Sequence, residues 1–271
     1  GDEILLPDPG FMMYRNLATV IGAVPRFYST YPKEAGGPKK AGGRFATDAA
    51  EIESLITERT RVLFLNSPSN PTGAVMTRAE IEAACAVADR HGLVVVSDEI
   101  YDFFTYDSAY ASPVAFAEQC VQLGGFSKTY GIPGWRMGYA TGPAKVLDAM
   151  KTLQQFSFVC APAPFQHALL DVAFDLDMRP YFDDYKRKRD HLARCLHASY
   201  GLLPPEGSFY AFPQLPKGTN GASFLQAAIE HKLLIVPGNA FSARDTHFRI
   251  SFAADDAVLQ RGIDVLKQLA V

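Results

Sequence analysis

The pattern of apolar and polar residues alternates between short apolar runs and amphipathic stretches through the first two-thirds of the chain. Strands are predicted at residues 4–6, 61–65, 93–97 and 138–141, and helices at 14–21, 48–57 and 77–91. This alternation is typical of an α/β fold with a mostly parallel sheet and helices on both faces. The helix at 77–91 has the clearest signal, because Thr77 and Glu80 can form a capping box and Gly92 can end the helix.

The pattern changes in the last third of the chain. Long helices are predicted at 144–157, 164–175 and 179–199, followed by strands at 208–212, 233–236 and 247–252 and helices at 222–231 and 255–269. Such a mixture predicts a smaller C-terminal α+β lobe. We therefore expect a large domain over residues 1–175 and a small domain over residues 176–271, with a short Gly/Pro/Lys loop at 36–43.

Composition narrows the class of protein and of partner. The chain has 271 residues, 48% of them hydrophobic and 20% charged, with a net charge of −3, which is ordinary for a globular protein. The absence of a long Lys/Arg run argues against nucleic acid or an anionic membrane as a partner. The apolar stretches are much shorter than the roughly 18 residues of a membrane-spanning helix. Small molecules are the expected ligands.

The cysteines and histidines give no sign of a metal site or of disulfide bonds. Cys85, Cys120, Cys160 and Cys195 lie 35 to 40 residues apart with no CxxC pair, and the six histidines show no metal-ligand spacing. We expect reduced, mostly buried thiols, as in a cytoplasmic protein.

Polar residues follow two of the predicted strands at the edge where open parallel sheets bind ligands. Asn66 and Asn70 follow one strand, and Asp98, Glu99 and Tyr101 follow the next. Asn70 is also a common turn residue before proline, and the two carboxylates could simply cap a helix. A paired-carboxylate site is disfavoured, because adjacent residues leaving a strand point in opposite directions.

Lys128 is the most unusual lysine, because apolar and small residues surround it in VQLGGFSKTYGIPGWRMGY. A partly apolar pocket disfavours the ammonium form and leaves the amine free to attack a carbonyl. A lysine snorkelling at a helix start is the alternative. Arg249 alternates with apolar residues in HFRISFA, so it is either solvated or a clamp for a carboxylate.

Four segments, taken together, carry a family resemblance: NSPSNPTG at 66–73, SDEIY at 97–101, GGFSKTYGIPGWRMGY at 124–139, and VPGNAF with HFRISFA near the end. They resemble, in order, the motifs of class I/II aminotransferases, which are pyridoxal-phosphate enzymes of fold type I, and the likeness extends over essentially the whole chain. The resemblance implies transfer of an amino group between an amino acid and a 2-oxo acid by a ping-pong route. It also implies a homodimer as the usual assembly.

The resemblance also implies roles for the candidate residues. Lys128 would bind the cofactor aldehyde covalently and then move the proton of the substrate α-carbon. Asp98 would bind the pyridinium nitrogen, while Asn70 and Tyr101 would donate to the ring oxygen. The remaining roles are implied for Arg136 and Ser127 with the cofactor phosphate, for Phe11 stacked on the pyridine ring, and for Arg249 with the substrate carboxylate.

Two departures from the family pattern matter. Many relatives have a phosphate-binding serine where this chain has Gly125. Relatives also have a segment before the equivalent of GDEILL that includes a phosphate-binding loop and a tyrosine that reaches the neighbouring subunit. Without that segment, we expect the sheet to lack the neighbour of the first predicted strand and so to expose an edge.

Two other functions use the same cofactor. One is a lyase of the same fold that performs β-elimination, and the other is a non-catalytic cofactor-binding effector domain like those fused to winged-helix regulators. The amino donor and acceptor do not follow from the sequence, because Arg249 would bind the carboxylate that all amino acids share.

Overall fold

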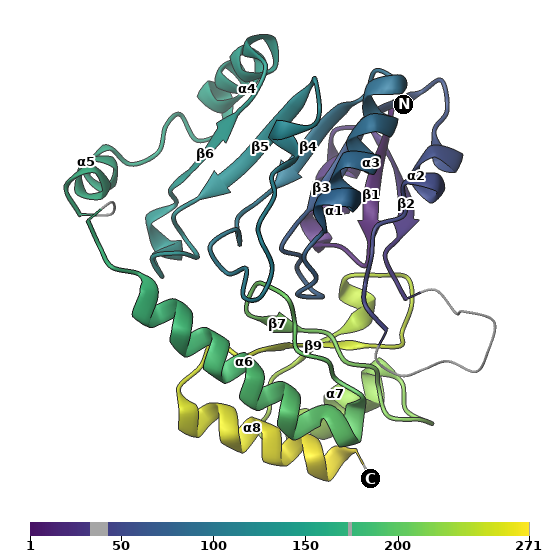
Figure 1. Cartoon of the computed structure of the whole chain (residues 1–271), viewed down its shortest axis with the longest axis vertical. Coiled ribbons are helices and arrows are strands. Elements are labelled where there is room, and N and C mark those ends of the chain that lie inside the picture. The colour runs from purple at the N-terminus through teal and green to yellow at the C-terminus, as the bar shows by residue number, and fades with distance from the viewer. Residues whose placement is uncertain (33–42, 173–174, 271) are drawn as a thin grey trace.

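The larger of two sheets organises the first half of the molecule. The computed structural model describes residues 1–32, 43–172 and 175–270, so most of the loop expected at 36–43 lies outside the described residues. The sheet has the order β2-β1-β3-β4-β5-β6, and every pairing is parallel except that of β6 with β5 (Figure 1). Its strands are β1 Glu3–Asp8, β2 Val24–Ser29, β3 Thr60–Asn66, β4 Val94–Asp98, β5 Cys120–Gly125 and β6 Gly138–Thr141. The predicted α/β class with a mostly parallel sheet is confirmed.

Helices cover both faces of this sheet, as predicted. Over all the described residues, the α-helices are α1 Met12–Val20, α2 Ala49–Leu55, α3 Arg78–Arg90, α4 Ala144–Ser157, α5 Ala163–Val172, α6 Arg179–Tyr200, α7 Gly221–Glu230 and α8 Asp256–Leu269. Three short 3₁₀ turns are η1 Pro113–Ala115, η2 Pro133–Trp135 and η3 Gly238–Ala240. Leu63 belongs to the core that α2 and α3 form on one face. Its neighbour Phe64 points the other way, and its ring lies 4.2 Å from that of Tyr14 in α1.

Local signals explain which elements were predicted. The capping box of α3 forms: Thr77 Oγ1 accepts from the Glu80 amide at 3.2 Å, and Glu80 Oε2 accepts from the Thr77 amide at 2.7 Å. Gly92 follows with φ +63°.

The sequence pattern did not predict strands β2 and β5. Pro25 interrupts the apolar run of β2, and it is tolerated there because β2 is an edge strand.

The second sheet is small and antiparallel, with the order β7-β9-β8. Its strands are β7 Tyr210–Ala211, β8 Val236–Pro237 and β9 Phe248–Ser251, all shorter than predicted. Helices α6, α7 and α8 pack beside it (Figure 1). The core of this lobe also contains Tyr101, Phe104 and Tyr106, which belong to the loop after β4. The two lobes therefore share one hydrophobic core at their junction.

The exposed sheet edge is not where the sequence suggested. Strand β1 lies between β2 and β3, so the expectation of a missing neighbour beside the first strand is wrong; the edges are β2 and β6. Helices α4 and α5 lie beyond β6, at the far end of the sheet from β2 (Figure 1). Five apolar side chains in and after these helices are 65–83% exposed: Leu153, Phe156, Phe158, Val159 and Leu170. We name these five residues the β6-side apolar residues.

Two other expectations can be compared with the fold. All four cysteines are free, but only Cys85 and Cys120 are fully buried, and Cys160 is exposed. Among the described residues, no helix has the length and apolar character needed to cross a membrane.

Candidate active site

A cavity of about 410 Å³ lies at the carboxyl ends of β3, β4 and β5, facing the smaller lobe. Its lining is Phe11, Tyr14, Asn70, Asp98, Ile100, Tyr101, Leu123, Gly124, Lys128, Tyr210 and Arg249. Six of the eight residues that the sequence singled out are in this set. The large sheet brings five of them together, because the carboxyl ends of its parallel strands meet at one edge, and β9 of the small sheet supplies Arg249.

Asp98 ends β4 with its carboxylate held at this cavity. The Tyr14 hydroxyl donates to Asp98 Oδ2 at 2.6 Å, and the Ile100 amide donates to Oδ1 at 3.1 Å. Burial raises the pKa of Asp98, and the repulsion of Glu99 adds to this, while the bonds from Tyr14 and Ile100 oppose it. Each carboxylate oxygen can accept a further hydrogen bond, so Asp98 can still receive a donor from the cavity.

Glu99 faces the other side of the sheet, as the alternation along the strand predicts. Its carboxylate is 1% exposed and accepts from Ser112 Oγ at 2.7 Å, from Gln122 Nε2 at 2.6 Å and from the Tyr110 hydroxyl. The adjacent carboxylates therefore do not share a ligand. In the part of the chain that the structure describes, no group of three or more His, Cys, Asp or Glu residues is arranged to hold a metal ion.

The loop after β3 is ordered by Asn66 and presents Asn70 to the cavity. Asn66 Oδ1 accepts from the Asn70 amide at 2.9 Å, and Asn66 Nδ2 donates to the Asp98 carbonyl at 3.0 Å. The Asn70 side chain is buried and accepts from Arg249 Nη1 at 2.9 Å. Asn70 therefore contacts Arg249 through its side chain, in addition to its place in the turn before Pro71.

Arg249 is a half-buried cation with unused hydrogen-bonding capacity. Its guanidinium lies between two aromatic rings, 4.3 Å from the centroid of Tyr210 and 4.8 Å from that of Phe241. Arg249 Nε is buried without a hydrogen-bond partner, and no described carboxylate forms an ion pair with this side chain. Burial lowers the pKa of Arg249. A carboxylate ligand would satisfy both the charge and the free donor.

Lys128 and Tyr101 complete the polar lining. Lys128 is half-buried in the segment between β5 and η2, and among the described residues no carboxylate forms an ion pair with it. The Tyr101 hydroxyl is buried and donates to the Tyr210 hydroxyl at 3.3 Å. Burial is the main reason why the pKa of Tyr101 lies well above its ordinary value.

Two predicted phosphate ligands, Ser127 and Arg136, do not line this cavity. Arg136 is exposed, has φ 55°, and donates from Nη1 to the Pro133 carbonyl at 2.9 Å. Ser127 is half-buried. Their roles stay predictions.

The sequence did not single out Tyr14 or Tyr210. Tyr14 follows Phe11 by three residues, which is a spacing that places two side chains near each other at the start of a helix, and their rings lie 5.6 Å apart. That spacing could have indicated Tyr14. Tyr210 belongs to a two-residue strand and carries no local signal, because only pairing with β9 brings it beside Arg249.

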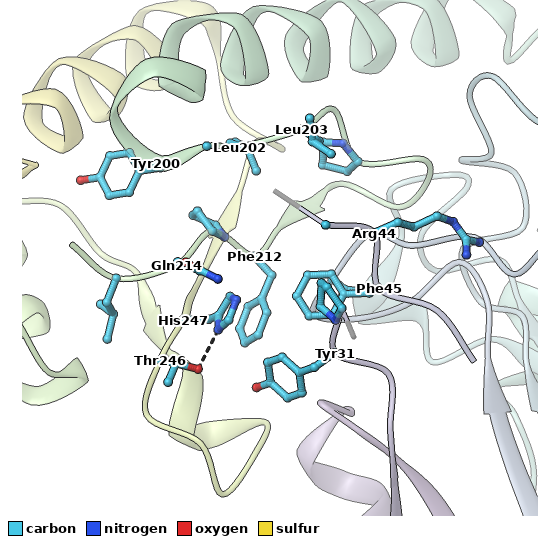
Figure 2. Close-up of a pocket in the computed structure, with 18 of the residues that line it drawn as sticks. Tyr31, Arg44, Phe45, Tyr200, Leu202, Leu203, Phe212, Gln214, Thr246 and His247 are labelled. Carbon is cyan, nitrogen blue, oxygen red and sulfur yellow. Dashed lines mark hydrogen bonds between the residues drawn. The ribbon is translucent and has the colours of Figure 1, made fainter. Parts of the chain in front are cut away.

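A second hollow, of about 1080 Å³, lies elsewhere between the lobes. Figure 2 shows its aromatic wall, where the rings of Phe212 and His247 stack 5.1 Å apart and Thr246 contacts His247. Its rim includes Pro32 and Gly43, which flank residues outside the description. None of the predicted site residues lines it, so its size does not make it the active site.

Comparison with known proteins agrees with the sequence motifs. Residues 1–266 match the family model described as aminotransferase class I and II. A probable aspartate aminotransferase of Methanocaldococcus jannaschii is 30% identical, and the match covers 99% of this chain and 71% of that protein. Two solved structures are similar: aspartate aminotransferase from Thermus thermophilus with maleate (TM-score 0.89, 30% identity, 99% and 70% covered) and aromatic aminotransferase from Pyrococcus horikoshii (TM-score 0.90, 28% identity, 99% and 73% covered). All three relatives are named aminotransferases, so the lyase and effector alternatives are not favoured.

Proposed function

Because the chain belongs to the class I and II aminotransferase family, we propose that the cavity at the carboxyl ends of β3, β4 and β5 binds pyridoxal 5′-phosphate and is the active site. The chain is an aminotransferase, an enzyme that moves an amino group between an amino acid and a 2-oxo acid. The observation that supports the site best is the convergence of Lys128, Asp98, Asn70, Tyr101 and Arg249 on one cavity.

The donors and acceptors around the cavity fit this cofactor and an amino acid. Asp98 is an acceptor aimed into the cavity, as a protonated ring nitrogen requires, and Arg249 has a buried free donor, as a substrate carboxylate requires. When bound, pyridoxal phosphate supplies an electron sink that makes the α-proton of an amino acid acidic. Lys128 would anchor the cofactor through its amine and take that proton on Nζ.

The remaining residues of the chain orient the reactants. Asp98 would form a charge-assisted hydrogen bond of about 1.5–3 kcal/mol to the ring nitrogen. Asn70 Nδ2 and the Tyr101 hydroxyl would donate to the ring oxygen, while Asn70 Oδ1 orients Arg249. Arg249 would bind the substrate carboxylate with two parallel hydrogen bonds, which fixes the α-carbon relative to Lys128.

Five parts of the proposal rest on the sequence more than on contacts. Phe11 would stack on the pyridine ring, and Ser127 and Arg136 would bind the phosphate. The domain division at residues 175 and 176, a homodimeric assembly of the longer family form and a cytoplasmic location are also proposed. Two of the relatives named above are called aspartate aminotransferases and one is called an aromatic aminotransferase, so we propose an amino acid and a 2-oxo acid as substrates without choosing between those two classes.

Reduction with borohydride in the presence of pyridoxal phosphate, followed by peptide mapping, tests the site. The label should attach to Lys128. Lys128→Ala should lose the label and lower turnover by more than about 100-fold, yet keep noncovalent cofactor binding. Lys145→Ala, a change at an exposed lysine of α4, is the control. A label on Lys145 or Lys151 would contradict the assignment.

A further inference from the structure

Tyr210 occupies a position between the two lobes that connects two proposed parts of the active site. In the small sheet, Tyr210 of β7 pairs with Ser251 of β9, so Arg249, two residues earlier on β9, lies diagonally across from Tyr210 on the same face. The guanidinium lies 4.3 Å from the Tyr210 ring centroid. The ring face of Tyr210 thus forms part of the surface that holds the Arg249 side chain.

The hydroxyl of Tyr210 contacts the other lobe. Tyr101 donates to it at 3.3 Å, and the two rings meet edge to face with centroids 5.7 Å apart. Both tyrosines are buried. A hydroxyl has one donor and two acceptor positions. If Tyr101 turns its proton toward an oxygen in the cavity, Tyr210 can turn its own proton toward Tyr101 and keep the pair hydrogen-bonded.

We infer that Tyr210 is a positioning residue with two separable functions: its ring orients Arg249 toward the substrate carboxylate, and its hydroxyl supports Tyr101 as a donor to the cofactor ring oxygen. The inference rests on the proposed function of the cavity. The ring function follows from the geometry, because two aromatic faces hold Arg249 and leave its charge for the ligand. The hydroxyl function follows from cooperativity, because a hydroxyl that accepts a hydrogen bond becomes a stronger donor.

Two substitutions separate these functions. Tyr210→Phe keeps the ring and removes the hydroxyl, whereas Tyr210→Leu removes both. Tyr200→Phe is the matched control, because Tyr200 is a buried tyrosine of the same core whose hydroxyl donates to the Leu266 carbonyl and which does not line the 410 Å³ cavity. A general loss of packing would affect the control as well.

The ring function is measured without cofactor, by titrating 3-phenylpropionate into the cofactor-free chain and following the Arg249 guanidinium by NMR. Tyr210→Leu should weaken binding roughly 5- to 30-fold, which is the loss of one desolvated cation–π contact. Tyr210→Phe and Tyr200→Phe should bind within about twofold of the parent. Unchanged affinity in Tyr210→Leu would overturn the ring function.

The hydroxyl function is measured with cofactor, from the pH midpoint of the visible absorbance of the bound pyridoxal phosphate. Tyr210, Asp98 and Arg249 are the titratable groups that act on Tyr101. Tyr210→Phe should weaken donation from Tyr101 and move the midpoint to higher pH, by roughly two- to fourfold in proton concentration. A midpoint equal to that of Tyr200→Phe would overturn this function. If the parent chain forms no absorbing complex, the proposed function fails instead, and the phenylpropionate titration still decides the ring function.

Discussion

The hydrogen bond between Tyr14 and Asp98 should control how readily Asp98 keeps its negative charge. Burial raises the pKa of Asp98 above its ordinary value of 3.8, and the bond from Tyr14 at 2.6 Å is the largest contribution in the other direction. A hydrogen bond to a charged group contributes about 1.5–3 kcal/mol. Tyr14→Phe removes it and should therefore raise the proton-binding constant of Asp98 roughly 10- to 150-fold.

The sign of the pH dependence follows from this change. A carboxyl whose pKa is raised on folding stabilises the fold at pH values below its unfolded pKa, and this stabilisation is lost as the pH rises through the folded pKa. Tyr14→Phe moves the upper end of that window to higher pH. A protonated Asp98 could not neutralise a charged ring nitrogen, so cofactor affinity should fall as well.

The assay is a ¹³C NMR titration of aspartate carboxyls in the cofactor-free chain. Tyr28→Phe is the control, because Tyr28 is a buried tyrosine that donates to the Phe64 carbonyl rather than to a carboxylate. The resonance of Asp98 should titrate at higher pH in Tyr14→Phe and at its original pH in Tyr28→Phe. The reasoning would be refuted by an Asp98 titration that stays in place or moves to lower pH in Tyr14→Phe.

Three further predictions concern the cavity and the sheet edge. Asp98→Asn should lower turnover far more than Asp102→Asn, because Asp102 is partly buried but does not line the cavity; similar turnover numbers would contradict the role of Asp98. Arg249→Lys should raise KM roughly 10- to 100-fold for every substrate, because an ammonium group cannot replace the paired N–H donors of the planar guanidinium. An effect confined to dicarboxylic substrates would mean that Arg249 binds the side-chain carboxylate of the substrate instead. The exposed β6-side apolar residues should make the chain self-associate, so sedimentation velocity should show less association for Phe156→Glu, while Leu234→Glu, at an 86% exposed position on the other lobe, should not differ from the parent.

Much of the fold follows from local sequence signals, because those elements satisfy their own hydrogen bonds. Helix α3 is the clearest case, since Thr77, Glu80 and Gly92 determine both of its ends within the segment itself. Strand β2 depends instead on its partner. Its sequence includes Pro25, and only pairing with β1 on one side makes it a strand. The periodicity of a segment cannot reveal a strand that depends on pairing with another part of the chain.

The same distinction applies to the candidate site. The sequence predicted Asp98 and Asn70 because each follows a strand, and strand ends have a known place in a parallel sheet. The sequence did not indicate Tyr14 or Tyr210, because each matters through a distant partner: Asp98 lies 84 residues from Tyr14, and Tyr101 lies 109 residues from Tyr210. The opposite holds for Ser127 and Arg136: their motif matches the family, but they do not line the cavity in the described structure.

The shared core at the junction of the lobes limits how this protein can be divided. Tyr101, Phe104 and Tyr106 come from the first lobe in sequence but fill the core of the second in space. A gene fragment that begins at residue 176 would encode α6, α7, α8 and the small sheet without the three aromatic side chains that fill their core. Recombination between relatives at that boundary would mismatch the same three side chains with a foreign core. The unit that evolution can exchange here is therefore larger than the smaller lobe, and it includes the loop that carries Tyr101 into the active site.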